Sequence, residues 1–189
     1  MKVLIACEFS GIVREAFKAR GHDAWSCDLL DTEVPGQHIK GDFRSIIQDT
    51  WDFVGYHYEC RVMANSGVRW LYEIPGRWQE LDEACEIFNI TISDTRPGYS
   101  ENPIQHKHAR QRILRNYDQI IHPWQFSHTT KKATCLWLNG GLIKLNHTKI
   151  IPLELRTDEI HREPPGPDRW KNRSRTFRGI ANAMATQWG

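Results

Sequence analysis

The 189-residue sequence lacks several features that would place it in a functional class directly. No apolar run exceeds six residues, so it offers no transmembrane span and no signal peptide, and a cytoplasmic location is expected. Its five cysteines form an odd set without a CxxC pair, which argues against a zinc cluster or a disulfide framework and favours reduced thiols. A GxGxxG fingerprint is also missing, so the sequence gives no sign of a dinucleotide site of that type.

What the sequence does contain is an ordinary apolar content and an uneven charge distribution. Hydrophobic residues make up 40% and charged residues 25%, which suits a single α/β domain with a substantial core, residues 1–189. Residues 1–102 carry 10 Lys/Arg against 17 Asp/Glu, whereas residues 103–156 carry 9 against 2. An acidic first half and a basic second half suit a protein that holds a neutral or cationic cofactor and faces a polyanion. A solvated basic face without a partner is the alternative.

The first thirty residues predict one βαβ unit. An apolar strand at 2–7 breaks at Gly11, an amphipathic helix follows at 12–19, and a second strand at 22–27 ends on Asp28. A glycine at such a turn allows a ligand to approach the backbone, and the helix N-terminus behind it favours an electron-rich group. An acid at the end of the second strand can accept both hydroxyls of a ribose. The opening therefore predicts a nucleoside-bearing cofactor, although any βαβ unit shares these features.

Further strand and helix signals alternate along the rest of the chain. The predicted strands are 37–40, 51–56, 99–100 and 133–138, and the predicted helices are 44–50 (a short helical turn), 77–89, 104–116 and 178–185. Proline and charge are concentrated in residues 157–175, which predicts a linker. The alternation predicts a Rossmann-like α/β sandwich with a mostly parallel sheet and helices on both faces.

Four polar segments stand at the ends of successive predicted strands. They are Phe9-Ser10-Gly11, Asp28 with Asp42, Cys60, and Glu101-Asn102. This ordered set resembles that of the cytosine carbon-5 DNA methyltransferases, which use S-adenosylmethionine, and more narrowly that of the short phage and prophage proteins of this group. The runs Asn65-Ser66-Gly67-Val68-Arg69-Trp70, Pro123-Trp124-Gln125-Phe126 and Cys135-Leu136-Trp137-Leu138 are similar too, so the resemblance covers about 1–145 and 173–189.

The resemblance implies an S-adenosylmethionine-dependent methyltransferase sandwich and assigns roles to residues. Cys60 would be the nucleophile and Glu101 the acid that holds the base, supported by Asn102. The cofactor pocket would be lined by Phe9, Ser10, Gly11, Asp28 and Asp42 and closed by Gly179 and Ala181. The domain would divide into a cofactor and catalytic half (1–102), a basic part facing nucleic acid (103–156), the linker (157–175) and a closing helix (176–189), without a separate target-recognition domain.

The implied reaction is methyl transfer to carbon 5 of cytosine in DNA through a covalent cysteine adduct. Because the base must leave the duplex to reach such a pocket, DNA with a flipped cytosine is the implied partner, in the host cytoplasm for a phage-encoded protein. A free nucleotide or a single strand is the alternative substrate. The candidate phosphate contacts are Arg69, Arg110, Arg112, Lys131 and Lys132. No metal is expected, because His106 and His108 lie off a common helical face and no acid completes a site.

The candidate catalytic loop departs from the family pattern. Tyr58-Glu59 replaces the Pro-Pro that precedes the nucleophile, and two prolines would stiffen the loop. A carboxylate at Glu59 would raise the pKa of the Cys60 thiol, while Arg61 would lower it. The closing segment reads Gly-Ile-Ala instead of Gly-Asn-Ser, which removes polar cofactor contacts. The alternative function is therefore a catalytically impaired protein that binds cofactor or DNA without methylating, with Cys60 as a surface thiol and Glu101 as a carboxylate at a helix N-terminus.

Overall fold

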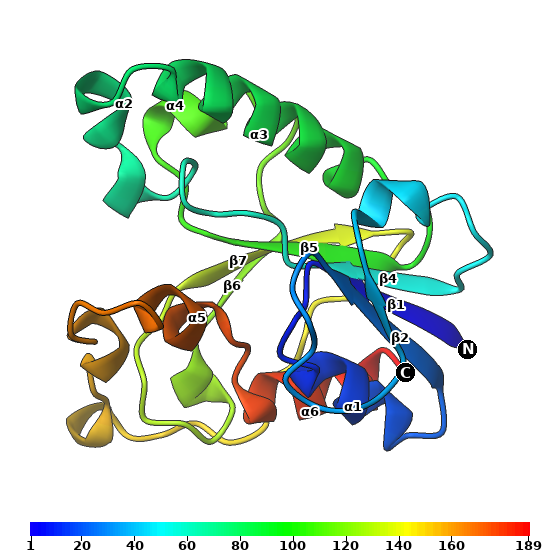
Figure 1. Cartoon of the computed structure of the whole chain (residues 1–189). Coiled ribbons are helices and arrows are strands. Elements are labelled where there is room, and N and C mark those ends of the chain that lie inside the picture. The colour runs from blue at the N-terminus through cyan, green and yellow to red at the C-terminus, as the bar shows by residue number, and fades with distance from the viewer.

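A seven-stranded mixed sheet forms the centre of the computed structural model, which describes all residues from Met1 to Gly189 (Figure 1). Its strands are β1 (Lys2–Ala6), β2 (Asp23–Asp28), β3 (His38–Lys40), β4 (Phe53–Tyr56), β5 (Gly98–Pro103), β6 (Gln119–Ile121) and β7 (Thr134–Asn139). The spatial order is β3-β2-β1-β4-β5-β7-β6; β1 to β5 are parallel, and β7 is antiparallel to both of its neighbours. This is the doubly wound order with one antiparallel strand inserted between β5 and β6. The predicted α/β class and mostly parallel sheet are confirmed.

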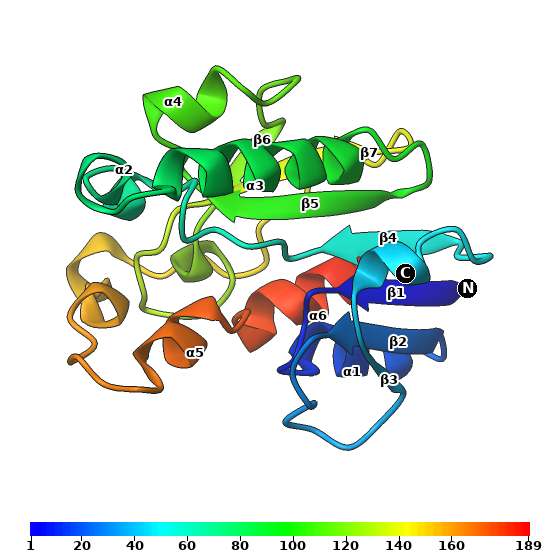
Figure 2. The same cartoon turned by 45° about the horizontal axis from the view of Figure 1, so that its top comes forward.

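Helices cover both faces of this sheet (Figures 1 and 2). Helices α1 (Ile12–Lys18) and α6 (Arg178–Gln187) pack side by side on one face, and α3 (Arg77–Ile92) lies on the other. Strand β1 contributes to the cores on both faces of the sheet. Val3 and Ile5 pack beneath α1 and α6, whereas Leu4 and Ala6 belong to a cluster on the opposite face, as the two-residue period of a strand requires. A strand buried on both faces gives the unbroken apolar run seen in the sequence.

Most of the predicted elements are present with shifted ends. The opening βαβ unit is confirmed as β1, α1 and β2, and the helix predicted at 77–89 is α3, which continues to Ile92. The remaining short helices of the first 155 residues are η1 (Phe43–Ser45), η2 (Asn65–Gly67), α2 (Trp70–Glu73), η3 (Pro123–Gln125) and η4 (Leu153–Leu155). Strand β6 is not predicted by the sequence pattern, because three residues are too few to show a period.

The helix predicted at 104–116 is wrong in extent, because α4 spans only Lys107–Arg110. Beyond α4 the backbone carbonyls bind tertiary partners instead of forming helical hydrogen bonds. A side chain of α3 donates to the carbonyl of Arg112 at 3.0 Å, and the Trp137 indole of β7 donates to that of Arg115 at 3.0 Å. This arginine-rich stretch therefore folds as turns fixed onto α3 and β7.

Residues 157–175, called the strap below, fold against the rest of the protein, so the prediction of a linker is corrected. The strap contains η5 (Glu159–His161) and α5 (Arg169–Ser174). The ring centroids of Trp170 and Phe9 lie 5.9 Å apart, and the Arg175 guanidinium donates to the Glu33 carboxylate at 2.8 Å. These contacts place α5 over the turn that follows β1, on the same side of the sheet as α6 (Figure 1).

Candidate active site

The carboxyl ends of the central strands bring the candidate catalytic residues together. Strand β4 pairs Tyr56 with Ser100 of β5, so the loop that follows β4 begins beside Glu101. Strand β7 runs the opposite way and pairs Thr134 with Pro103, so the residues before β7 meet the end of β5. The sheet register therefore joins three segments that are far apart in sequence.

A small cavity of about 10 Å³ lies at this junction, with room for about one water molecule. Its polar lining consists of His57, Glu101, Lys132, Thr134 and Thr176. Its apolar wall comes from β6 and from the start of α6. Of the predicted site residues, Glu101 and Lys132 line this cavity, while His57, Thr134 and Thr176 carry no role in the sequence analysis.

Cys60 is half-buried at the start of a turn, and its carbonyl accepts hydrogen bonds from the backbone of Met63 and Ala64 at 3.2 and 2.9 Å. Burial raises the pKa of the Cys60 thiol to about 11, and the negative charges of Glu101 and Glu59 act in the same direction. The positive charge of Lys132 lowers this pKa. This environment therefore favours the protonated thiol at neutral pH.

The loop residues beside Cys60 are held by their own contacts. The Glu59 carboxylate accepts a hydrogen bond from the Arg61 backbone N–H at 2.7 Å. The Arg61 guanidinium points instead toward the Glu80 carboxylate of α3, at 3.4 Å. The cation that lowers the thiol pKa is thus Lys132, whereas the sequence analysis assigned that effect to Arg61.

Glu101 and Asn102 lie within β5, opposite Leu136 and Cys135 of β7. Glu101 is therefore not a carboxylate at a helix N-terminus, since the next helix starts six residues beyond it, at Lys107. Asn102 is completely buried, and its Nδ2 donates to the backbone carbonyl of Tyr58 at 3.3 Å. Asn102 thus supports the Cys60 loop rather than the Glu101 carboxylate.

His57 is the main site residue that the sequence analysis missed. Its side chain is only 7% exposed, and its Nδ1 lies 3.7 Å from Oε1 of Glu101 and 3.4 Å from Oγ1 of Thr176. Its Nε2 lies 2.8 Å from the buried Tyr99 hydroxyl. The only sequence signal was its position, directly after a predicted strand and three residues before Cys60.

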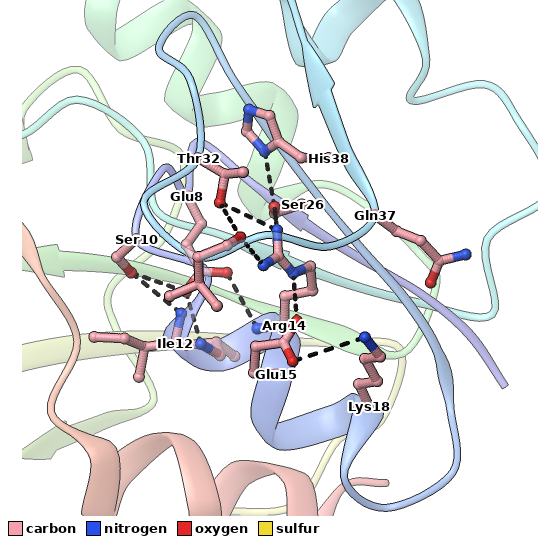
Figure 3. Close-up of polar contacts among 12 residues, drawn as sticks. Glu8, Ser10, Ile12, Arg14, Glu15, Lys18, Ser26, Thr32, Gln37 and His38 are labelled. Carbon is pink, nitrogen blue, oxygen red and sulfur yellow. Dashed lines mark hydrogen bonds and ion pairs between the residues drawn. The ribbon is translucent and has the colours of Figure 1, made fainter.

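The turn after β1 is organised by Glu8, a second residue that the sequence analysis missed (Figure 3). Its buried carboxylate accepts hydrogen bonds from the backbone of Val13 and Arg14 at 2.7 and 3.1 Å, and from the Ser10 hydroxyl at 3.2 Å. A carboxylate at the N-terminus of α1 satisfies free N–H groups and is stabilised by the helix dipole. Glu8 therefore fixes the conformation of Phe9-Ser10-Gly11.

Gly11 is required by this protein's own packing. Its φ of +70° is left-handed, and a Cβ there would lie 2.7 Å from Nη2 of Arg14. Arg14 is fully buried and donates to Ser26 Oγ at 2.9 Å and to the carbonyl of Val34 at 2.6 Å (Figure 3). The sequence analysis explained Gly11 by ligand approach, but the atoms close to it belong to Arg14 and Val34.

Two predicted acids lie at the carboxyl edge in different environments. Asp28 is half-buried, its Oδ1 accepts the Leu30 N–H at 2.9 Å, and burial raises its pKa. Asp42 caps η1 and forms a two-pronged pair with Arg44, which lowers its pKa. A half-buried acid at the end of β2 fits the hydroxyls of a ribose, so the donor set of this edge fits a nucleoside group.

The prediction that Gly179 and Ala181 close the cofactor pocket is corrected. Ala181 is fully buried in the core beneath α6. A Cβ on Gly179 would lie 1.9 Å from the carbonyl oxygen of Phe126, so this glycine permits close packing of α6 against the loop after β6. The residues just before them, Thr176 and Phe177, are the ones that line the cavity.

The predicted phosphate-binding residues are divided between two regions. Arg69 and Arg110 are exposed, near α2 and α4. Arg112 is engaged by Asp82 of α3, and Lys132 donates to the carbonyl of Arg173 in the strap at 2.8 Å. Lys131 lies 3.9 Å from Asp158. Arg112, Lys131 and Lys132 therefore have polar structural partners, whereas the guanidinium groups of Arg69 and Arg110 form no ion pair or hydrogen bond within the protein.

Comparison with known proteins identifies no family for this chain. A scan against protein-family models finds no match, and a search of the curated proteins finds no significant similarity. No group of three or more His, Cys, Asp or Glu side chains is placed to hold a metal ion. No helix is long and apolar enough to span a membrane.

Proposed function

We propose that this protein is an S-adenosylmethionine-dependent methyltransferase that acts on carbon 5 of cytosine in DNA. The observation that carries the proposal is a cavity at the carboxyl edge of the sheet that Glu101 and Lys132 line together, while the charges of both residues act on the pKa of the Cys60 thiol. A carboxyl group and a cation from two separate segments thus influence a nucleophile carried by a third. The doubly wound strand order supports the methyltransferase sandwich that the sequence resemblance implies.

The residues can supply the chemistry that cytosine requires. Carbon 5 is a poor nucleophile until the Cys60 thiolate adds to carbon 6 and makes carbon 5 enamine-like. The Glu101 carboxyl group would hydrogen-bond the ring nitrogen and stabilise the charge that develops there. After carbon 5 is methylated, its proton leaves to water, the carbon–sulfur bond breaks and the thiolate is restored. Lys132 would stabilise the thiolate before addition and after release.

The cofactor would lie along the turn after β1 and the end of β2. Asp28 would accept hydrogen bonds from the ribose hydroxyls. Asp42, whose carboxylate is paired with Arg44, would lie near the bound cofactor. When bound, S-adenosylmethionine would supply an electrophilic methyl group, and the bond from its sulfonium sulfur to that methyl would break to leave the neutral thioether S-adenosylhomocysteine. Trp170 of the strap packs against Phe9 in this turn, with the two ring centroids 5.9 Å apart.

Cytosine would reach Cys60 only after leaving the DNA duplex, because the thiol is half-buried. The exposed cations near α2 and α4, Arg69 and Arg110, would contact phosphates.

One observation favours a second candidate function. The pKa of the Cys60 thiol is about 11, and Glu59, which stands where the family has proline, contributes to that increase. A thiol that stays protonated is a poor nucleophile. The second candidate is therefore a methyltransferase-like protein that binds cofactor or DNA without methylating.

Calorimetric titration with S-adenosylmethionine, followed by transfer of a labelled methyl group, tests these functions. We expect cofactor binding and transfer to cytosine that is abolished by Cys60→Ala. The matched variant restores the family loop, Tyr58→Pro with Glu59→Pro, and we expect it to transfer faster than the natural chain. Comparing nucleotide, single-stranded and duplex substrates identifies which form of cytosine is used.

Each negative result points to one conclusion. If the natural chain binds the cofactor without transfer and the Pro-Pro variant transfers the methyl group, the second candidate, a catalytically impaired protein, is established. Binding without transfer by either chain excludes the methyltransferase proposal and supports a binding module. Absence of cofactor binding excludes the methyltransferase proposal and leaves only the DNA-binding form of the second candidate.

A further inference from the structure

A second cavity lies beside the Cys60 loop and has no part in the chemistry above. Its volume is about 150 Å³, and it is lined by Arg61, Gly67, Trp70, Ile74 and Arg77. The lining contains two guanidinium groups, one indole and one aliphatic side chain, and no acidic residue. This combination offers an aromatic surface together with positive charge.

Trp70 presents an aromatic face at this cavity. Trp70 is 38% exposed, which is unusual for a tryptophan. The Arg69 guanidinium lies 4.1 Å from the centroid of the ring and holds it by a cation–π contact. An exposed and positioned indole is a stacking platform for a nucleobase, since every base has a π face.

The two arginines of the cavity share one carboxylate. Nη1 of Arg77 lies 2.6 Å from Glu80, and Nη2 of Arg61 lies 3.4 Å from the same oxygen. The Nε atom of Arg77 is buried without a hydrogen-bond partner. Nε of Arg61 also lies 3.9 Å from Oε1 of Glu59, and these carboxylates do not take up all the donors of two guanidinium groups, each of which carries five. The remaining donors suit a phosphate, which arginine binds through two parallel hydrogen bonds.

We propose that this cavity binds a nucleotide next to the target cytosine, with its base on Trp70 and its phosphate between Arg61 and Arg77. Arg61 follows Cys60 directly in the chain, so the cavity and the thiol are neighbours on one loop. The identity of the target base rests on the proposed function. The nucleotide site itself rests on the cavity, the indole and the two guanidinium groups.

Calorimetric titration of the full chain tests the site with three probes: a single-stranded T-C-T trinucleotide, 2′-deoxycytidine 5′-monophosphate and inorganic phosphate. We expect Trp70→Ala and Arg61→Gln each to weaken trinucleotide binding about fivefold or more, because stacking and charge contribute at that level. The monophosphate carries one base and one phosphate, so its binding should weaken in the same two variants. Trp70→Phe should retain most of the affinity, because it keeps an aromatic face.

Tyr72→Ala is the matched control, since Tyr72 is an exposed aromatic residue of the same helix that does not line the cavity. It should bind the trinucleotide like the natural chain. The proposal is overturned if Trp70→Ala and Arg61→Gln leave the trinucleotide affinity unchanged, if Tyr72→Ala weakens it equally, or if inorganic phosphate binds as tightly as the trinucleotide. Trp70-dependent binding without methyl transfer would leave this site standing while excluding the proposed enzyme.

Discussion

The buried amide of Asn102 donates a hydrogen bond to the backbone carbonyl of Tyr58, at 3.3 Å. A residue of β5 thereby holds the loop that carries Cys60. Because the residues just before Cys60 include no proline to stiffen this loop, its conformation depends on such tertiary contacts.

We expect Asn102→Ala to lower the free energy of unfolding by about 1–3 kcal/mol, because buried carbonyls lose their donor. Asn102→Asp should cost more, since a buried carboxylate would face carbonyl oxygens. Urea unfolding measures both. Equal stability of Asn102→Asp and the natural chain would show that the contact does not hold the loop.

The alkylation rate of Cys60 should rise with pH and level off only near the thiol pKa of about 11. The thiolate is the reactive form, and burial with two nearby carboxylates opposes its formation. Glu59→Gln should lower the pKa and speed alkylation at fixed pH by up to about tenfold, the effect of one pKa unit. Lys132→Gln should raise the pKa and slow the reaction.

Mass spectrometry of the peptide containing Cys60 separates its reaction from that of the four other cysteines. Unchanged rates in both variants would mean that burial alone sets this pKa.

Breaking the ion pair between Arg175 and Glu33 should loosen the strap with little effect on global stability. Both side chains are about one-third exposed, so the pair contributes under about 1 kcal/mol. We expect Glu33→Gln to increase hydrogen exchange in α5 while leaving the exchange of β1 unchanged. The charge-swapped pair Glu33→Arg with Arg175→Glu should restore protection in α5; failure to restore it contradicts a direct pairing.

Gly36→Ala should destabilise the natural chain by about 1–3 kcal/mol, because the new Cβ would lie 2.8 Å from Nη2 of Arg14. In an Arg14→Met background the same substitution should cost less, since the guanidinium is gone. Chemical unfolding of the two single variants and the double variant gives the coupling energy, expected at about 0.5–3 kcal/mol. Purely additive costs would exclude the contact.

Local sequence patterns predicted the elements that owe their form to periodicity. The apolar run of β1, the helical spacing of α3 and the alternation of strands with helices were sufficient for the α/β class and for the opening βαβ unit. They failed at 104–116, where side chains from other elements donate hydrogen bonds to the carbonyls of Arg112 and Arg115. They also failed in the strap, where a segment rich in proline and charge contains two short helices.

The sequence by itself therefore determined the alternating elements, because the order of apolar and polar residues shows the period of a strand or a helix. It also placed Asp28, Cys60 and Glu101 after or near strand ends. Only the tertiary structure decided what surrounds them. The antiparallel insertion of β7 brings Lys132 to Glu101, and the register of β4 brings His57 to the same cavity. Contacts between distant segments depend on sheet order and register, which no local pattern encodes. The environment that raises the pKa of Cys60 arises from those contacts.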